Sequence, residues 1–425
     1  MRIPSRNLRL IGSALVVVPA LLSALYFSFI PLNYVIRYLS IDKELGAVLI
    51  YVLSLFLLVK AGVRWKYRNY RIIVVSALLL LFPFYAFLRI VFDSDPSSEI
   101  RGFIGPLMLN PFIGLLGLYA AGNRRGIMIG LWIMSTTVLL FVVYAMMMGS
   151  IVDGQIDMFP SLAQEQVAYQ NPGMYLSFLV LIELSLLIEP NAGLTRRFVS
   201  LLIIGLATFC IFEVASRSSI VAISIAFLLI VLARLVGVLR GIARKKSVLT
   251  FYAVVCSLPI LIPLIATQLE ETRLVGRLVI LVDGGDTSQR IYLFTSAWRS
   301  FTENLEHIVF GAGGMAFEKV NEQYPHNILL ELCTDYGLVG LILFTAPFFY
   351  VLSLVVKGRR HFKGWFNRAS VMVFIGYFVI AQFTGTLQTS WELVFFGMLL
   401  FSLRNSDLAS IPATAPIGNQ KSIQM

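Results

Sequence analysis

Long apolar stretches recur along this chain, and their length limits its fold more than any other feature. Examples are Ile11–Ile30, Ile72–Leu88 and Ile220–Leu232 with its flanks. About 20 apolar residues in a helix span the hydrocarbon core of a bilayer, and in lipid a crossing segment must satisfy its own backbone groups. Only 13% of the residues are charged and 58% are hydrophobic, whereas soluble domains have about 25% charged residues. The sequence therefore predicts an all-α polytopic membrane protein.

About twelve transmembrane helices are expected. The spans are 10–31, 45–60, 72–92, 102–122, 126–149, 172–189, 198–215, 218–235, 248–268, 336–356, 369–386 and 389–403. This organisation gives helices 1–9 in residues 1–267, one large loop over 268–326, helices 10–12 in 327–404 and a tail over 405–425. The tail is rich in Ser, Pro, Ala, Gln and Asn and is expected to be disordered.

The distribution of charge along the chain predicts its orientation. With the N-terminus in the cytoplasm, the even-numbered connections are strongly basic: Lys60, Arg64, Lys66, Arg68, Arg71, Arg124, Arg125, Arg196, Arg197, Arg240, Arg244, Lys245, Lys246, Lys357, Arg359, Arg360, Lys363 and Arg368. The opposite connections carry acids: Asp93, Asp95, Glu99, Asp153, Asp157 and Glu165. This pattern follows the positive-inside rule. It places both termini in the cytoplasm and the large loop outside, and it explains the net charge of +11 without a nucleic-acid partner.

The large loop has internal order. The stretch Asp283–Ser288 is typical of a turn followed by a helix N-cap. Apolar residues then recur at helical spacing, namely Ile291, Phe294, Trp298 and Phe301. We therefore predict an amphipathic helix over about 289–301 that lies on the membrane surface, ended by the glycines of 311–314.

Three residues are candidates for chemistry on the outer face. Arg217 stands in a tight turn between two spans, where an arginine is costly unless it has a partner. Arg290 falls in the first turn of the predicted loop helix, whose free N–H groups favour an anion. His326 lies where the loop re-enters the membrane, and a neutral imidazole can accept a proton near pH 7.

Each candidate also has a purely structural interpretation. Arg217 could pair with Glu213 or reach to the lipid headgroups, Arg290 could be an exposed arginine paired with Asp286, and His326 could be an interfacial or helix-capping residue. Glycines 311 and 313 are compatible with a turn as well as with a phosphate cradle.

Metal and cofactor chemistry have little support in the sequence. Two acidic pairs, Asp93 with Asp95 and Asp283 with Asp286, could hold a cation, but solvated loop carboxylates look the same in sequence. No histidine–cysteine cluster suggests zinc, and no nucleotide-binding glycine motif follows a strand. We expect neither a metal nor a cofactor.

Three motifs in order carry a resemblance to a known family. They are Ser216-Arg217-Ser218 at the start of a span, Gln289-Arg290 before an aromatic helix and Gly311-x-Gly313, and His326-Asn327-x-x-Leu330-Glu331 leading to Asp335-Tyr336-Gly337-x-x-Gly340. In this order and topology the chain resembles the bacterial O-antigen ligase and O-antigen polymerase family, by motif over roughly 200–345 and by topology over most of its length.

The resemblance implies a glycosyltransferase-C-like helical fold in the bacterial inner membrane. It implies transfer of glycan from undecaprenyl diphosphate on the periplasmic face, without nucleotide sugar or metal, to a glycan or lipid A–core acceptor. Carried over by motif, Arg217 and Arg290 bind the lipid diphosphate and His326 helps to activate the acceptor. The same motifs make Asn327, Glu331, Gly311 and Gly313 candidates for substrate binding.

Two questions stay open at this level. A loop of only about 60 residues slightly favours a polymerase over a ligase. From another class, a polytopic transporter or polysaccharide flippase fits twelve spans equally well, although such proteins place their sites near the midplane on broken helices. A non-catalytic membrane scaffold would leave the three candidate residues without a shared role.

Overall fold

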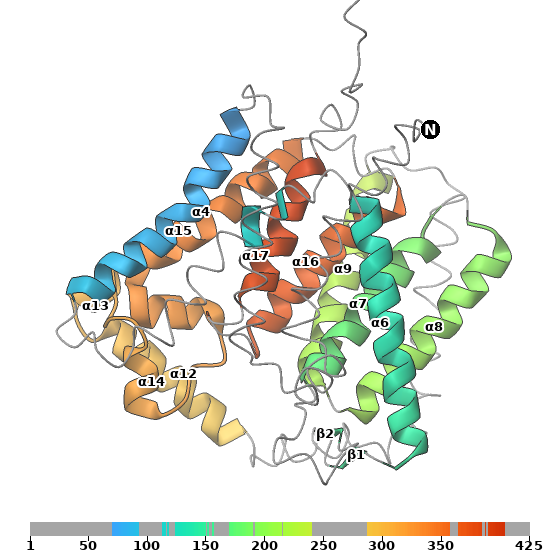
Figure 1. The fold of residues 1–425 in the computed structure, drawn as a ribbon, viewed down its shortest axis with the longest axis horizontal. Helices are drawn as coiled ribbons and strands as arrows, with labels where there is room; N and C mark the ends of the chain where they lie inside the picture. Colours follow the sequence, from blue (N-terminus) through green and yellow to red (C-terminus); the bar gives the residue numbers. More distant parts are fainter. Residues whose placement is uncertain are drawn as a thin grey trace, which may run out of the picture.

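A computed structural model describes residues 70–92, 113–115, 117–118, 124–149, 151–152, 155–156, 170–189, 192–214, 216–239, 287–357, 364–384, 387 and 390–403. Its longer helices are α4 (Tyr70–Phe92), α6 (Arg124–Met147), α7 (Gln170–Leu187), α8 (Leu194–Glu213), α9 (Arg217–Leu239), α12 (Thr287–Thr302), α15 (Ile328–Lys357), α16 (Trp365–Ala381) and α17 (Trp391–Leu399) (Figure 1). Short elements complete this part of the chain: α13 (Leu305–Phe310), α14 (Ala316–Asn321), the 3-10 helix η4 (Leu400–Leu403), and a two-residue antiparallel ladder of β1 (Ile151–Val152) and β2 (Gln155–Ile156).

The described part is therefore helical apart from that small ladder, as the apolar pattern predicts. Within it, Ile127–Met147, Leu194–Glu213 and Ile328–Leu354 are long and apolar enough to cross a membrane. Shorter apolar helices cover Ile73–Arg89, Pro172–Leu187, Arg217–Leu229 and Trp365–Ala381. The predicted spans 10–31, 45–60 and 248–268, and most of 102–122, lie outside the described residues, as does the tail over 405–425.

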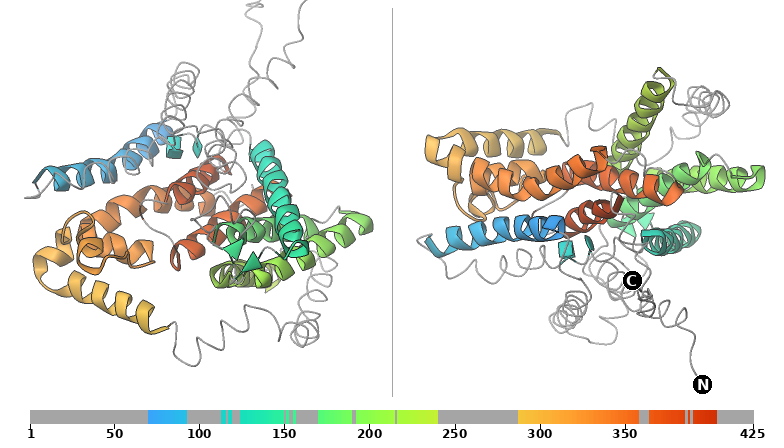
Figure 2. Two further views of the ribbon diagram at one scale, coloured as in Figure 1. Left: turned by 60° about the horizontal axis from the view of Figure 1, so that its bottom comes forward. Right: turned by 90° about the horizontal axis from the view of Figure 1, so that it is seen from above.

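Helix α7 forms the centre of one half of the molecule. It packs against α6, α8, α9 and α16, and from Pro172 to Ser185 every residue is buried. A helix that is apolar on all sides is buried on all sides. Figures 1 and 2 show α6 and α8 at the far side of this half, while α4, α15 and the short helices α12–α14 lie together on the opposite side.

Two polar links show which helix ends lie together. Arg368 in the first turn of α16 forms an ion pair with Glu189, just beyond the last turn of α7. At the other end of α16, the carbonyl of Gln382 accepts a hydrogen bond from the Asn327 side chain, 3.1 Å away, directly before α15. Because α8 and α9 continue α7 as successive antiparallel helices, α9 begins at the same end as α15. We call this end, defined by Arg217, Asn327 and Gln382, the loop end.

Helix α15 departs from the predicted span. The sequence predicts a helix over 336–356, but α15 begins at Ile328 and is broken at Gly337, whose φ of 64° and ψ of −166° are not helical. The backbone carbonyls just before the break lose their partners within the helix. The predicted last span, 389–403, is also only partly α-helical, since α17 ends at Leu399 and η4 follows.

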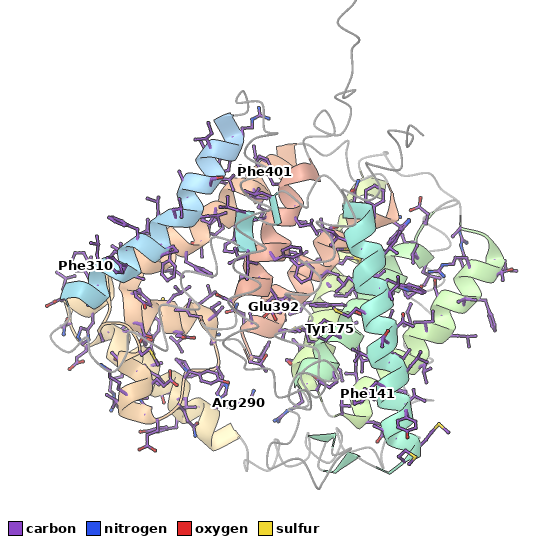
Figure 3. The ribbon with its side chains drawn as sticks, in the orientation of Figure 1. Phe141, Tyr175, Arg290, Phe310, Glu392 and Phe401 are labelled. Atoms are coloured by element: carbon purple, nitrogen blue, oxygen red, sulfur yellow. The ribbon has the colours of Figure 1, made fainter. Side chains whose placement is uncertain are left out.

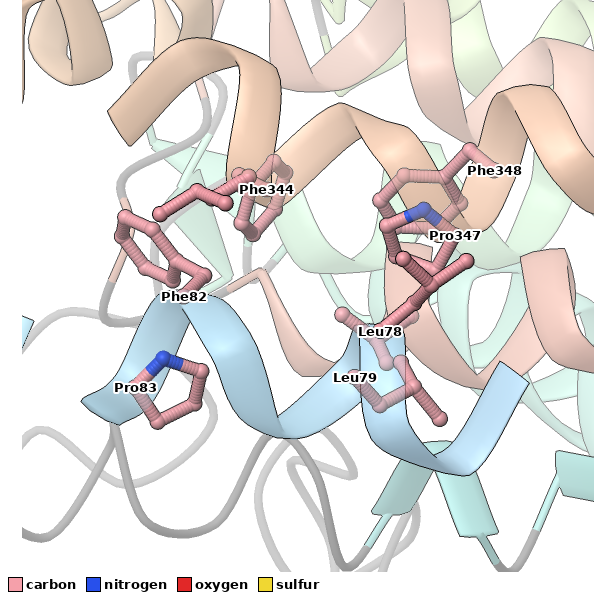
Figure 4. A pocket seen from close by; sticks show the side chains of 9 residues that line it. Leu78, Leu79, Phe82, Pro83, Phe344, Pro347 and Phe348 are labelled. Atoms are coloured by element: carbon pink, nitrogen blue, oxygen red, sulfur yellow. The ribbon is translucent and has the colours of Figure 1, made fainter. Parts of the chain in front are cut away.

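An apolar groove runs between α4 and the second half of α15. Leucine, phenylalanine and proline side chains line it, including Pro83 and Pro347 (Figure 4). Among the described residues, no titratable side chain lines it, so it suits an apolar chain or a neighbouring helix. None of the candidate residues Arg217, Arg290 and His326 lines this groove.

Replacing Gly337 by alanine should destabilise the protein strongly. An added Cβ would lie 2.4 Å from the Val309 carbonyl oxygen, and the backbone region that Gly337 occupies costs other residues roughly 3 kcal/mol. We expect a lower thermal midpoint in detergent. The matched control is Gly205→Ala in α8, where nothing lies within 4 Å of the added carbon; its midpoint should stay level or rise. An unchanged midpoint for Gly337→Ala would contradict the broken helix.

Candidate functional site

The loop helices α12, α13 and α14 pack on the first half of α15. Leu293 and Ala297 of α12 form a small apolar cluster with Phe317 of α14, against which Leu330 of α15 packs. The predicted helix over 289–301 is therefore confirmed, within a slightly longer element. Helices α13 and α14 had no counterpart in the sequence analysis.

The face of α12 that packs on the protein contains Leu293 and Ala297 and lies beside the apolar face predicted for the membrane surface, with which it shares Phe301. Trp298 and Ile291, expected on the apolar face, are 59% and 56% exposed. The residues that pack inward, Leu293 and Ala297, are offset around the helix from them. Ala297 is fully buried, and its small side chain allows α12 to approach its neighbours closely. The exposed Trp298 and Ile291 leave α12 with a second apolar face, which fits the expected position at a membrane surface.

The backbone of the glycine-containing segment after α13 is hydrogen-bonded to α15 at its break. The amides of Ala312 and Gly313 donate to the carbonyls of Thr334 and Asp335, at 2.8 and 3.1 Å. These are carbonyls that the break at Gly337 frees from the helix. A Cβ on Gly311, whose φ is 80°, would lie 2.3 Å from the Asp335 carbonyl carbon. Close backbone packing thus accounts for Gly311, and a role of Gly311 and Gly313 in substrate binding stays a prediction.

Asp335 adds a second set of bonds to this junction. Its buried carboxylate accepts the amide of Met315 at 3.1 Å and that of Phe317 at 3.4 Å, at the start of α14. A carboxylate at this position satisfies N–H groups that a helix start leaves free. The Asp335-Tyr336-Gly337 motif therefore fixes the second half of the loop to the membrane helix.

His326 sits in a constrained position directly before α15. Its φ of 56° is left-handed, which is uncommon outside glycine. Its ring packs on Tyr324, with centroids 4.2 Å apart. Its Nδ1 atom is buried and forms no hydrogen bond with the described residues. Strained, incompletely bonded polar groups cluster at functional sites, so the imidazole is set up for a partner from outside this part of the chain.

Arg290 and His326 lie close enough for their charges to interact. Burial of the imidazole lowers the pKa of His326 below its ordinary value of 6.5, and the nearby positive charge of Arg290 lowers it further. Figure 3 shows Arg290 near the start of α12, on the side that faces the rest of the helices. The two residues are far apart in sequence and are brought together by the packing of α12 on α15. His326 is thus held neutral near pH 7, the form that can accept a proton.

Replacing Arg290 by glutamine should raise the pKa of His326. Loss of the guanidinium removes one of the two causes of the lowered value, while burial remains, so the pKa should stay below 6.5. NMR titration of histidine-labelled protein, assigned with a His326→Asn variant, measures this shift. Arg290→Lys keeps the charge and should leave the value nearly unchanged. An unshifted His326 pKa in Arg290→Gln would contradict the proximity of the two side chains.

Arg217 opens α9 at the loop end. The hydroxyls of its buried neighbours Ser216 and Ser219 lie 2.7 Å apart. Gly173 of α7 approaches so closely that an added Cβ would lie 2.2 Å from the Ser216 Oγ. This first turn is therefore fixed rigidly against α7, and the Arg217 Nη1 atom is buried. Arg217 shares the loop end with His326 on a separate helix, and its convergence with Arg290 on one ligand stays a prediction.

Asn327 and Glu331 use their side chains within the protein. The Asn327 Oδ1 accepts the Leu330 amide at 2.9 Å as the cap of α15, and its amide group donates to Gln382. The buried Glu331 carboxylate accepts the Leu387 amide at 3.0 Å. Both residues tie the start of α15 to the chain between α16 and α17. Their contact with substrate stays a prediction. The bonds show that both residues fix the start of α15, directly after His326.

Among the residues that the structure describes, no group of three or more His, Cys, Asp or Glu side chains could hold a metal ion. The candidate pairs Asp93 with Asp95 and Asp283 with Asp286 lie outside those residues. Independence from metal stays a prediction from the resemblance.

Two further residues meet this site that the sequence did not indicate. The Tyr85 hydroxyl donates to the carbonyls of Phe310 and Tyr336, at 3.0 and 3.2 Å. The Arg89 guanidinium donates to the Gly311 carbonyl at 3.0 Å. Tyr85 and Arg89 are four residues apart and so share one face of α4. This spacing was visible in the sequence, but nothing in it identified a partner more than 200 residues away.

Comparison with known proteins points to the region that contains the candidate residues. Apolar helices long enough to cross a membrane define a membrane protein, and the helices α12–α14 carry Arg290 and lead to His326. Residues 202–345 match the family model described as O-antigen ligase. This confirms the predicted resemblance over a region that contains Arg217, Arg290 and His326, and it points to an enzyme of surface polysaccharide synthesis. A comparison with curated proteins finds no match for the chain.

Proposed function

We propose that this protein is a glycosyltransferase that moves glycan from undecaprenyl diphosphate on the periplasmic face of the bacterial inner membrane. The observation that carries the proposal is the pairing of Arg290 with a neutral, incompletely bonded His326 inside the region that matches O-antigen ligase. A permanent cation beside a proton acceptor suits a reaction in which an anion leaves and a hydroxyl attacks.

The chemistry assigns each residue a step. The oxygen of the acceptor hydroxyl attacks the anomeric carbon of the donor, and the bond from that carbon to the phosphate oxygen breaks. His326 accepts the proton of the hydroxyl, a contribution of roughly 10²–10⁴-fold for a general base. Arg217 and Arg290 stabilise the lipid diphosphate, whose negative charge grows as the bond breaks. Their planar guanidinium groups can each contact two oxygen atoms.

The two acceptor classes share this donor chemistry. A polymerase adds the chain to another lipid-linked repeat, whereas a ligase adds it to lipid A–core sugar. We favour the polymerase because the large loop is only about 60 residues long. Gene deletion followed by gel analysis of the surface polysaccharide tests this choice. Collapse of the ladder to a single repeat is expected, whereas accumulation of long, lipid-linked chains would identify a ligase.

The topology behind this proposal has its own test. A reporter that is active only in the periplasm should be active when fused after Asp157 or Asn304 and inactive after Arg244 or Arg360. The reason is the charge asymmetry of the connections. In Figure 1 the ladder β1–β2 and the start of α12, both in connections predicted to be periplasmic, lie toward the same side of the molecule. Activity after Arg244 would overturn the topology and, with it, the periplasmic site.

A further inference from the structure

Helix α4 bonds to the chain at the junction where α13 ends beside α15. Tyr85 and Arg89 bond to three backbone carbonyls there, those of Phe310, Gly311 and Tyr336. The first two carbonyls end α13, and the third precedes the break at Gly337 in α15. Ring contacts extend the same face of α4, since Phe82 and Tyr336 meet edge to face with centroids 5.3 Å apart.

This junction lies between the two candidate residues in sequence. Helices α12 and α13, with Arg290, precede Gly311, and α14 with His326 follows it. The segment has no helical continuity of its own, because Gly311 and Gly313 both have positive φ values. The distance between Arg290 and His326 therefore depends on how this junction is held as well as on the packing of α12 on α15.

We propose that Tyr85 and Arg89 are positioning residues for the glycosyl transfer, which set Arg290 relative to His326 by fixing the Phe310–Gly311 junction. The inference rests on the proposed function for its catalytic consequence, and on geometry alone for the placement of Arg290. Neither residue needs to touch the substrate. A shift of about 1 Å at a catalytic group can cost about 10²-fold in rate, so a lost backbone bond at the junction has a large effect at a distance.

The test compares Arg89→Met, Arg89→Lys and Tyr85→Phe. Methionine keeps the aliphatic bulk at position 89 and removes the donor, and lysine retains a donor for the Gly311 carbonyl. Arg299→Met and Tyr144→Phe are matched controls, because both side chains are exposed, on α12 and α6. The measurements are kcat and KM for transfer, and the His326 pKa by NMR.

We expect Arg89→Met to lower kcat about 10²-fold and to raise KM for the donor, because the displaced Arg290 also binds the donor diphosphate. The His326 pKa should rise toward 6.5 in the same variant, because Arg290 is no longer held beside the imidazole. Arg89→Lys should keep kcat and the His326 pKa close to those of the unsubstituted protein. Tyr85→Phe should shift kcat and the His326 pKa in the same directions by smaller amounts. Because this substitution removes no charge, a change in the His326 pKa would come from altered geometry. The two controls should behave as the unsubstituted protein.

An unchanged kcat or His326 pKa in Arg89→Met would overturn the proposal. So would equal loss in Arg89→Lys and Arg89→Met, which would make Arg89 a direct ligand of the diphosphate. If Arg89→Met does not fold, Tyr85→Phe decides by the same criteria. The pKa readout needs no turnover, so a protein without transferase activity would refute the proposed function and still test the junction.

Discussion

His326→Ala should abolish turnover and leave binding of the lipid-linked donor largely intact. A general base acts on the acceptor hydroxyl, whereas the donor is held by the two arginines. Loss of at least the 10²–10⁴-fold contribution of a general base is expected in kcat. Single-turnover assays measure the rate, and binding of radiolabelled donor to protein in nanodiscs measures affinity.

The left-handed backbone of His326 calls for a second variant. Asparagine tolerates this conformation better than other residues, but its amide cannot take up the proton. His326→Asn should therefore fold normally and be as inactive as His326→Ala. Activity in His326→Asn close to that of the unsubstituted protein would rule out His326 as the base. The acidic limb of the kcat/KM profile should also lie below pH 6.5, since the pKa of the free enzyme's imidazole is lowered.

Arg217→Ala and Arg290→Ala should each remove most of the activity, and the double variant should lose little more than either alone. Residues that act as one unit on one group are strongly non-additive. Lysine at either position should also fail, because a point charge cannot give the planar contact with two oxygens. Initial rates at several donor concentrations, compared in a double-mutant cycle, measure the coupling.

Additive losses would mean that the two arginines bind different groups. Arg299→Ala is the matched control, since Arg299 is exposed on the same helix as Arg290 and should leave the rate unchanged. Rescue by lysine at Arg217 or Arg290 would show that charge alone is needed there, in contrast to Arg89, where lysine is expected to work.

The sequence predicted the helices well because apolar length and spacing are local properties. Spans such as 72–92 and 172–189 fall on α4 and α7 within a few residues, and the loop helix over 289–301 falls on α12. The face of α12 that packs on the protein could not be chosen from the sequence, because apolar residues surround much of the helix. Only packing against Phe317 and Leu330 selects Leu293 and Ala297 as the buried pair.

The sequence named candidate residues for the site but could not give their geometry. Motifs pointed to Arg290 and His326, but their proximity depends on tertiary contacts, namely the packing of α12 on α15 and the hydrogen bonds from the Ala312 and Gly313 amides to the carbonyls of Thr334 and Asp335. The break at Gly337 that frees those carbonyls could not be predicted, since a glycine in an apolar run is equally compatible with a continuous helix. The contacts of Tyr85 and Arg89 with the loop depend on tertiary structure in the same way.

The most direct test is reconstitution of the purified protein in vesicles with undecaprenyl-diphosphate-linked glycan, in the presence of EDTA. Product glycans are resolved by size, free undecaprenyl diphosphate is measured, and His326→Asn serves as the inactive control. With the unsubstituted protein we expect longer glycans and one free undecaprenyl diphosphate for each glycosidic bond formed, and with the variant neither product. Intact donor that crosses the bilayer without loss of its glycan would identify a flippase, and activity that returns only with Mg²⁺ or Mn²⁺ would contradict a metal-free site built on Arg217, Arg290 and His326.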